Sequence, residues 1–73
     1  MKITIESTTK IVELNGIPCR IWEGETESGI KMHAFISRVA IGKDENAEEF
    51  ARELQQCAAP SVAVEFIPDR LII

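Results

Sequence analysis

Hydrophobic and polar residues alternate in two runs near the start of the chain. In residues 1–6 every second residue is apolar, which is the period of a β-strand with one buried face. The polar residues 7–9 interrupt this pattern, and apolar residues then recur over residues 10–22 on both sides of an Asn15-Gly16 pair. An Asn-Gly pair between apolar runs favours a two-residue type I′ turn, so the sequence predicts a β-hairpin. The pattern leaves open whether residues 1–6 form an extra N-terminal strand.

The expected turn fixes which residues of the hairpin share a face. With Asn15 and Gly16 as the loop, one face carries three pairs: Leu14 with Ile17, Val12 with Cys19, and Lys10 with Ile21. The other face carries Glu13 with Pro18, Ile11 with Arg20, and Thr9 with Trp22. The first face is the more apolar, so we expect it to form the core. The face with Ile11, Arg20 and Trp22 is then at least partly exposed to solvent.

A polar loop over residues 23–29 leads into a second β-rich run over residues 30–41. The loop therefore closes a second hairpin. The apolar residues of this run change face near Phe35 and Ile36. The strand either contains a bulge at that point or is covered on both faces in its second half, and the pattern leaves both possibilities open.

A helix is predicted after this strand. Asn46 with Glu49 three residues later forms a capping-box pattern, and Asp44 is the rival cap. Apolar residues then follow at helical spacing: Ala47, Phe50, Ala51, Leu54, Cys57 and Ala58. We expect this stripe to pack against the sheet and Pro60 to end the helix.

Residues 62–67 predict a last strand, and the apolar residues 68–73 either extend it or dock on another subunit. The expected fold is α+β in a single domain over residues 1–73: an antiparallel three-strand meander, one packing helix and a C-terminal strand (β-β-β-α-β). A domain of this length buries a small core. Because 45% of its residues are apolar, we expect a homo-oligomer.

Composition and charge limit the kinds of site and partner that we expect for this chain. Cys19 and Cys57 are too few for a disulfide framework, and with His33 as the only histidine they offer no paired metal-ligand spacing. The net charge of -4 argues against broad nucleic-acid binding, and direct DNA binding is not expected. No leader-like or membrane-spanning pattern is present in the sequence, so we expect a cytoplasmic protein with no membrane partner.

Catalysis is not expected. A nucleophilic site needs a base beside the nucleophile, and the only imidazole lies on a predicted strand. A Cys19–His33 dyad is formally possible, but an ordinary buried cysteine and strand histidine explain both residues. The glycines are isolated turn residues rather than a phosphate loop. We therefore expect a protein that is not an enzyme and has no cofactor.

A binding role fits the residues better. Arg20 and Trp22 share a face with Ile11, Lys31 and His33 lie on the neighbouring predicted strand, and a further cation, Arg38, follows them. An aromatic ring beside cations suits a protein partner or a stacked nucleotide. The alternative is that Trp22 only covers the sheet.

The acids suggest a different class of protein. Five of them form a modest acidic surface on the predicted helix and the residues before it: Asp44, Glu45, Glu48, Glu49 and Glu53. Carboxylates on such a surface can mimic DNA phosphates. A solvated helix face is the ordinary explanation.

The stretch "TTKIVELNGIPCRIWEG", followed by "GIKMHAFISRVA" and "FARELQQ", resembles short, largely uncharacterised accessory proteins of tailed bacteriophages and prophages. The likeness covers residues 8–61. It implies an inhibitor that binds a host defence component stoichiometrically in the host cytoplasm. Two alternatives are an oligomeric sponge that sequesters a cyclic or dinucleotide immune signal, and a phage structural or assembly protein. The residues expected to bind are Ile11, Arg20, Trp22, Lys31, His33 and Arg38.

Overall fold

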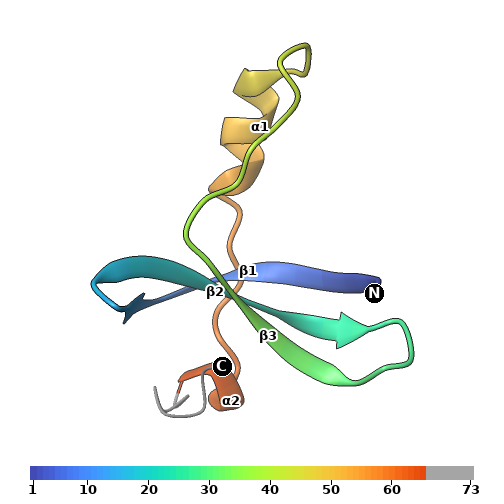
Figure 1. Cartoon of the computed structure of the whole chain (residues 1–73), viewed down its shortest axis with the longest axis vertical. Helices are drawn as coiled ribbons and strands as arrows, with labels where there is room; N and C mark the ends of the chain where they lie inside the picture. The colour runs from blue at the N-terminus through green and yellow to red at the C-terminus, as the bar shows by residue number, and fades with distance from the viewer. Residues whose placement is uncertain (66–73) are drawn as a thin grey trace.

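The computed structural model describes residues 1–65, which form three strands and two short helices (Figure 1). The elements are β1 (Ile3–Leu14), β2 (Ile17–Thr26), β3 (Lys31–Ile36), α1 (Ala47–Leu54) and α2 (Val62–Glu65). The strands form one antiparallel sheet in the order β1-β2-β3. The α+β class and the three-strand meander are therefore confirmed.

The turn between β1 and β2 is the expected one. Asn15 and Gly16 both have positive φ angles, 52° and 81°, as a type I′ turn requires. Beside the turn the register follows the prediction: Leu14 with Ile17, Glu13 with Pro18, Val12 with Cys19, and Ile11 with Arg20. The Asn-Gly pair was therefore enough to predict the register of the strands beside the turn.

Further from the turn the register changes. Trp22 faces Ser7 instead of Thr9, and the expected pairing of Lys10 with Ile21 is also absent. Three residues, Thr8 to Lys10, lie opposite the single residue Ile21, which makes a β-bulge. Because β1 continues through this bulge from Ile3 to Leu14, residues 1–6 are not a separate strand.

The bulge is stabilised by the side chain of Thr8, which is fully buried. Its hydroxyl donates to the Ile21 carbonyl oxygen at 2.7 Å and accepts a hydrogen bond from the Lys10 backbone amide at 3.2 Å. A buried backbone group without a partner is costly. The hydroxyl supplies the partners that the interrupted ladder lacks, so β1 can carry two extra residues.

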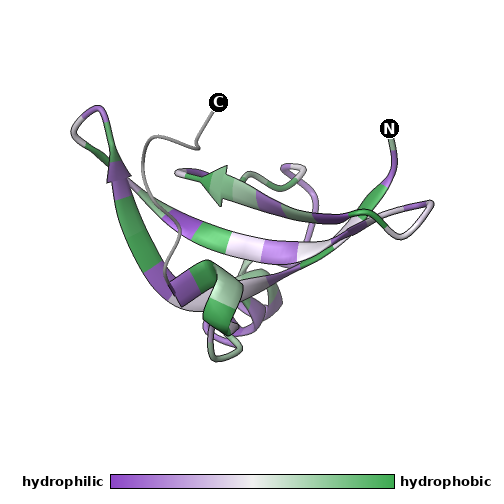
Figure 2. Cartoon of the chain, turned by 90° about the horizontal axis from the view of Figure 1, so that it is seen from below, coloured by the Kyte–Doolittle hydropathy of each residue, from purple (hydrophilic) through white to green (hydrophobic). Residues whose placement is uncertain are grey.

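The core lies on the face of the sheet that the sequence predicts. Cys19 and Ile21 of β2 are buried there. Helix α2, which contains the buried Val64, lies on the same side, because the Ser61 amide before it donates to Glu23, two residues after Ile21 on β2. Bands of hydrophilic and hydrophobic residues alternate along the strands in Figure 2. The more apolar face of the hairpin therefore forms the core, as its composition predicted.

The chain crosses from one face of the sheet to the other between the helices. Ala58 pairs with Thr8 in a parallel bridge along the edge of β1. The Thr9 amide donates to the Ala58 carbonyl at 3.1 Å, and the Ala58 amide donates to the Ser7 carbonyl at 2.9 Å. As a result α1 and α2 lie on opposite sides of the sheet (Figure 1).

Helix α1 is shorter and less buried than predicted. Asn46 is the cap, and its side-chain oxygen accepts from the Glu49 amide at 3.0 Å. The helix ends at Leu54, however, and Ala58 belongs to the bridge along β1. No residue of α1 is buried, and the helix points away from the sheet in Figure 1. The expected packing of its whole apolar stripe on the sheet is therefore wrong.

Two further expectations change at the ends of strands. The third strand ends at Ile36 rather than Ile41, because the chain bends at Ser37 and leaves the sheet toward α1. The apolar residues change face in the sequence near Phe35 and Ile36, which is where the strand ends. Of the last strand expected over residues 62–67, residues 62–65 form α2 instead. The rest of that expected strand and the apolar segment 68–73 lie outside the described residues.

Candidate binding surface

A groove lies between the sheet and the base of α1. Its volume is about 250 Å³. It is lined by Ile11, Pro18, Arg20, Trp22, Ile36, Ser37, Arg38, Val39 and Leu54, and we call it the Trp22 groove. It brings together four of the six residues predicted to bind, those from β1, β2 and the bend after β3.

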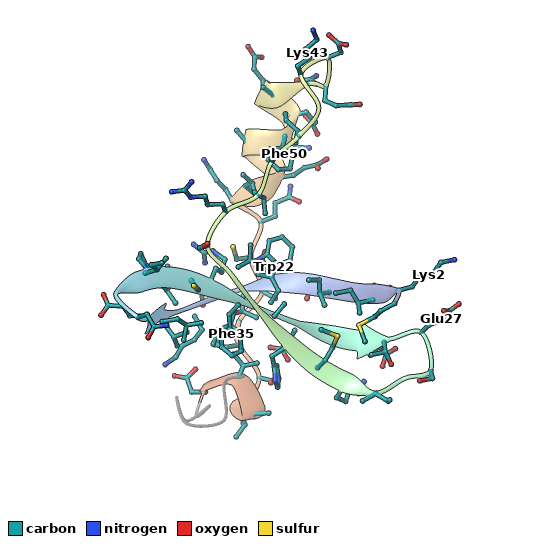
Figure 3. The ribbon with its side chains drawn as sticks, viewed as in Figure 1. Lys2, Trp22, Glu27, Phe35, Lys43 and Phe50 are labelled. Carbon is teal, nitrogen blue, oxygen red and sulfur yellow. The ribbon has the colours of Figure 1, made fainter. Side chains whose placement is uncertain are left out.

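Trp22 is half-buried and points to the α1 side of the sheet (Figure 3). Its cross-strand neighbours are small, Ser7 on β1 and Ala34 on β3. Small neighbours leave the large indole ring room over the sheet. The ring also lines an adjacent hollow of about 320 Å³ with Phe50 and Leu54 of α1. One aromatic side chain therefore borders both spaces between the sheet and the helix.

Arg20 lines the same groove but has a structural contact. Its guanidinium Nη1 donates to the Thr8 carbonyl oxygen at 2.8 Å. The side chain therefore satisfies a polar group of the bulge while its body forms part of the groove wall. Sequence reasoning placed Arg20 on the correct face and missed this bond, because the bulge that creates it has no local signal.

Arg38 follows β3 and is exposed at the groove. The ion pairs among residues 1–65 join Lys31 with Glu25 and Arg52 with Glu49. Arg38 takes part in neither of them. Its guanidinium can therefore pair with a carboxylate brought by a partner.

Lys31 and His33 lie on the opposite face of the sheet from Trp22. In the β2–β3 register Trp22 faces Ala34, so the odd-numbered residues of β3 point to the other side. Lys31 is paired with Glu25 at 2.9 Å, and this hydrogen bond raises the pKa of Lys31. The expected adjacency of these two cations to Trp22 is not found.

A second groove, of about 570 Å³, lies on the α2 side. It is lined by Glu6, Glu23, Gly24, Lys31, Met32, His33, Ala58, Ala59, Ser61 and Ala63. Glu23 Oε2 accepts a hydrogen bond from the Ser61 amide at 3.0 Å, and this bond is the main cause of the lowered pKa of Glu23. The Ser61 hydroxyl in turn accepts from the Val64 amide at 3.3 Å. The polar residues of this groove thus anchor α2, a contact across 38 residues that the sequence does not signal.

The described residues show no group of three or more side chains that could hold a metal ion. Both cysteines have free thiols, and Cys57 Sγ lies 3.6 Å from the Ser7 hydroxyl. Neither α1 nor α2 is long and apolar enough to cross a membrane. No model of a known protein family, no curated protein and no solved structure matches this chain.

Proposed function

We propose that this protein is a non-enzymatic accessory protein that binds a partner protein stoichiometrically through the Trp22 groove. The observation that carries the proposal is the arrangement of Trp22 and Arg38 in one apolar groove beside the exposed Ile11. Tryptophan and arginine are among the residues enriched in the hot spots of protein interfaces. A groove of about 250 Å³ suits a few side chains of such a partner.

The chemistry of the groove indicates what the partner presents. The walls are mostly apolar, and Arg38 supplies a charge that is not used within residues 1–65. We infer an apolar segment that carries a carboxylate. The resemblance to bacteriophage accessory proteins supports a host defence component as the target and the host cytoplasm as the place of action.

Sequestration of a nucleotide signal is the less favoured candidate. The Trp22 ring could stack on a base, and Arg38 could pair with a phosphate. However, Lys31 and His33 point to the other face of the sheet, and Arg20 donates to the Thr8 carbonyl oxygen. The cations needed to neutralise two phosphates are therefore not gathered around the ring.

Two variants test the proposed surface. Host proteins captured by the tagged wild-type chain are identified, purified and titrated against each variant by calorimetry. We expect saturation at one partner per chain, and at least a tenfold rise in Kd for Trp22→Ala and for Arg38→Glu, which is about 1.4 kcal/mol. Loss of the ring removes apolar contact area, and the charge reversal repels the partner's carboxylate.

Arg52→Glu is the matched control. It reverses an exposed cation of α1 that does not line the groove, so its Kd should equal that of the wild type. Wild-type binding by both Trp22→Ala and Arg38→Glu would exclude this surface. A dose-dependent rise in Tm with a cyclic dinucleotide, lost in Trp22→Ala, would instead favour the nucleotide candidate.

A further inference from the structure

One edge of the sheet is partly covered by the rest of the described chain, and the other edge is not. The edge of β1 is covered at its bulge, where Ala58 exchanges backbone hydrogen bonds with Ser7 and Thr9. On the other side of the sheet, β3 pairs with β2 alone among residues 1–65. The outer backbone groups of β3 are therefore available to a further strand.

β3 also lacks the features that usually protect a free edge. Exposed edge strands commonly carry a proline, a bulge or inward-pointing charges. The register between β2 and β3 runs without interruption from Lys31 to Ile36, and no proline occurs between these residues. Its one lysine lies at the first position, so the following five residues form a regular and mostly apolar edge.

The surface area of the chain is large for its mass. The accessible surface is 5941 Å², whereas a compact monomer of 8.1 kDa has about 4,500 Å². The difference is about 1,400 Å², and a standard interface buries about 800 Å² on each partner. The surplus is larger than the area that one standard interface covers on each partner.

We propose that β3 pairs antiparallel with β3 of a second copy, about a two-fold axis at Ala34, to form a continuous six-stranded sheet. A two-fold axis across an antiparallel pair must pass through a residue, because opposite side chains share a face. Centring on Ala34 places the smallest side chain of β3 at the axis, and Met32 then faces Ile36 of the second copy. It also uses all five residues from Met32 to Ile36.

The pairing is self-complementary and closed. His33 meets Phe35 of the second copy on the face that carries the core, and the Met32 and Ile36 side chains meet on the other face. The β3 edge of each copy is paired with the β3 edge of the other. No β3 edge is then left for a third copy, so assembly stops at a dimer. Ile36 also lines the Trp22 groove, whereas Met32 does not, so Met32→Lys tests this interface separately from partner binding.

A charge exchange tests the register. Sedimentation equilibrium of the wild-type chain should give twice the mass of one chain. Met32→Lys places a charge against Ile36 at two symmetry-related sites. It should raise the dimer Kd about a hundredfold, which is about 1.4 kcal/mol at each site. Adding Ile36→Glu creates two opposite-charge pairs across the axis, and the double variant should regain most of the affinity.

A disulfide trap tests the axis without depending on those variants. Cysteines introduced by Ala34→Cys should cross-link two chains under mild oxidation, because directly opposite Cα atoms lie within disulfide reach. Thr9→Cys, on the covered edge, is the matched control and should not cross-link. A folded wild-type monomer would overturn the proposal. So would a dimer that tolerates Met32→Lys, or a dimer in which Ala34→Cys fails to cross-link.

Discussion

Thr8 shows how one hydroxyl can decide the path of a strand. The residue is fully buried, donates to the Ile21 carbonyl and accepts from the Lys10 amide. Its own carbonyl accepts from Arg20. The bulge depends on these bonds, because each group would otherwise be buried without a partner.

Thr8→Val keeps the volume of the side chain and removes both hydroxyl bonds. We expect the free energy of unfolding to fall by about 1–3 kcal/mol, because the Ile21 carbonyl and the Lys10 amide lose their partner. Thr9→Val is the matched control on an exposed neighbour and should change it by less than about 0.5 kcal/mol. Urea titrations at one protein concentration measure both. Equal effects would show that the hydroxyl of Thr8 does not hold the bulge.

Glu23 makes the docking of α2 depend on pH. Its bond from the Ser61 amide lowers its pKa in the folded protein below the ordinary value of 4.5. A lowered folded pKa means that the stabilisation is fully present above pH 4.5 and is lost as the pH falls through the folded pKa. Acid should therefore weaken the contact between Glu23 and Ser61.

Glu23→Gln keeps an oxygen that can accept from Ser61 and removes the titrating charge. The wild type should be more stable than this variant at neutral pH, and the difference should shrink on acidification below pH 4.5. Denaturant titrations over that range measure the difference. A difference that stays constant with pH would contradict a role for the charge.

At the scale of elements, Gly24 lets β1 and β2 approach closely. A Cβ built on Gly24 would overlap the Thr4 carbonyl oxygen and lie 2.7 Å from the Ile5 Cα. Both are backbone atoms of β1, so neither can move without shifting the strand. A side chain at this position is therefore incompatible with the observed pairing.

Gly24→Ala should lower the free energy of unfolding by about 1–3 kcal/mol, because the backbone of β1 must shift. Gly42→Ala is the control: its added Cβ would lie 3.4 Å from the Glu45 Cγ, which is ordinary contact. That variant should be unchanged or slightly more stable. Thermal unfolding of both variants decides the matter, and equal Tm values would mean that β1 can shift at little cost.

Elements with a local signal were the ones that the sequence predicted well. The Asn15-Gly16 turn and the Asn46 cap each depend on a few adjacent residues, and both occur as expected. Helix α2 had no such signal, because Val62 to Glu65 carry two β-branched residues that favour a strand in isolation. Its helical form is supported by the Ser61 contacts with Val64 and Glu23, which are tertiary.

In the candidate site, too, the sequence predicted the features that have a local signal and not those that depend on tertiary structure. Ile11 and Arg20 were placed together because the turn fixes their register. Trp22 kept its face because it lies two residues from Arg20 on β2, whose pairing with β3 is uninterrupted there. Lys31 and His33 were expected beside Trp22 because their strand pairs with β2, but the register of that pairing was not worked out from the sequence. In the observed register Trp22 faces Ala34, so both cations point to the other side of the sheet.

For the molecule as a whole, burial is concentrated in few residues. Cys19, Ile21 and Val64 are the buried hydrophobic residues among those described. Ile11, Ile17, Ile30 and Val62 are each more than half exposed. A domain with so small a core gains stability from every additional interface. The proposed dimer and the proposed partner complex each cover part of this surface.

The bridge between Ala58 and β1 has a consequence for synthesis. The hairpin of β1 and β2 can form as soon as it leaves the ribosome, but the bridge residue Ala58 and helix α2 are synthesised only later. Until α2 has been made, the nascent chain therefore carries an open apolar sheet. Newly made chains are most exposed to chaperones and proteases in that interval.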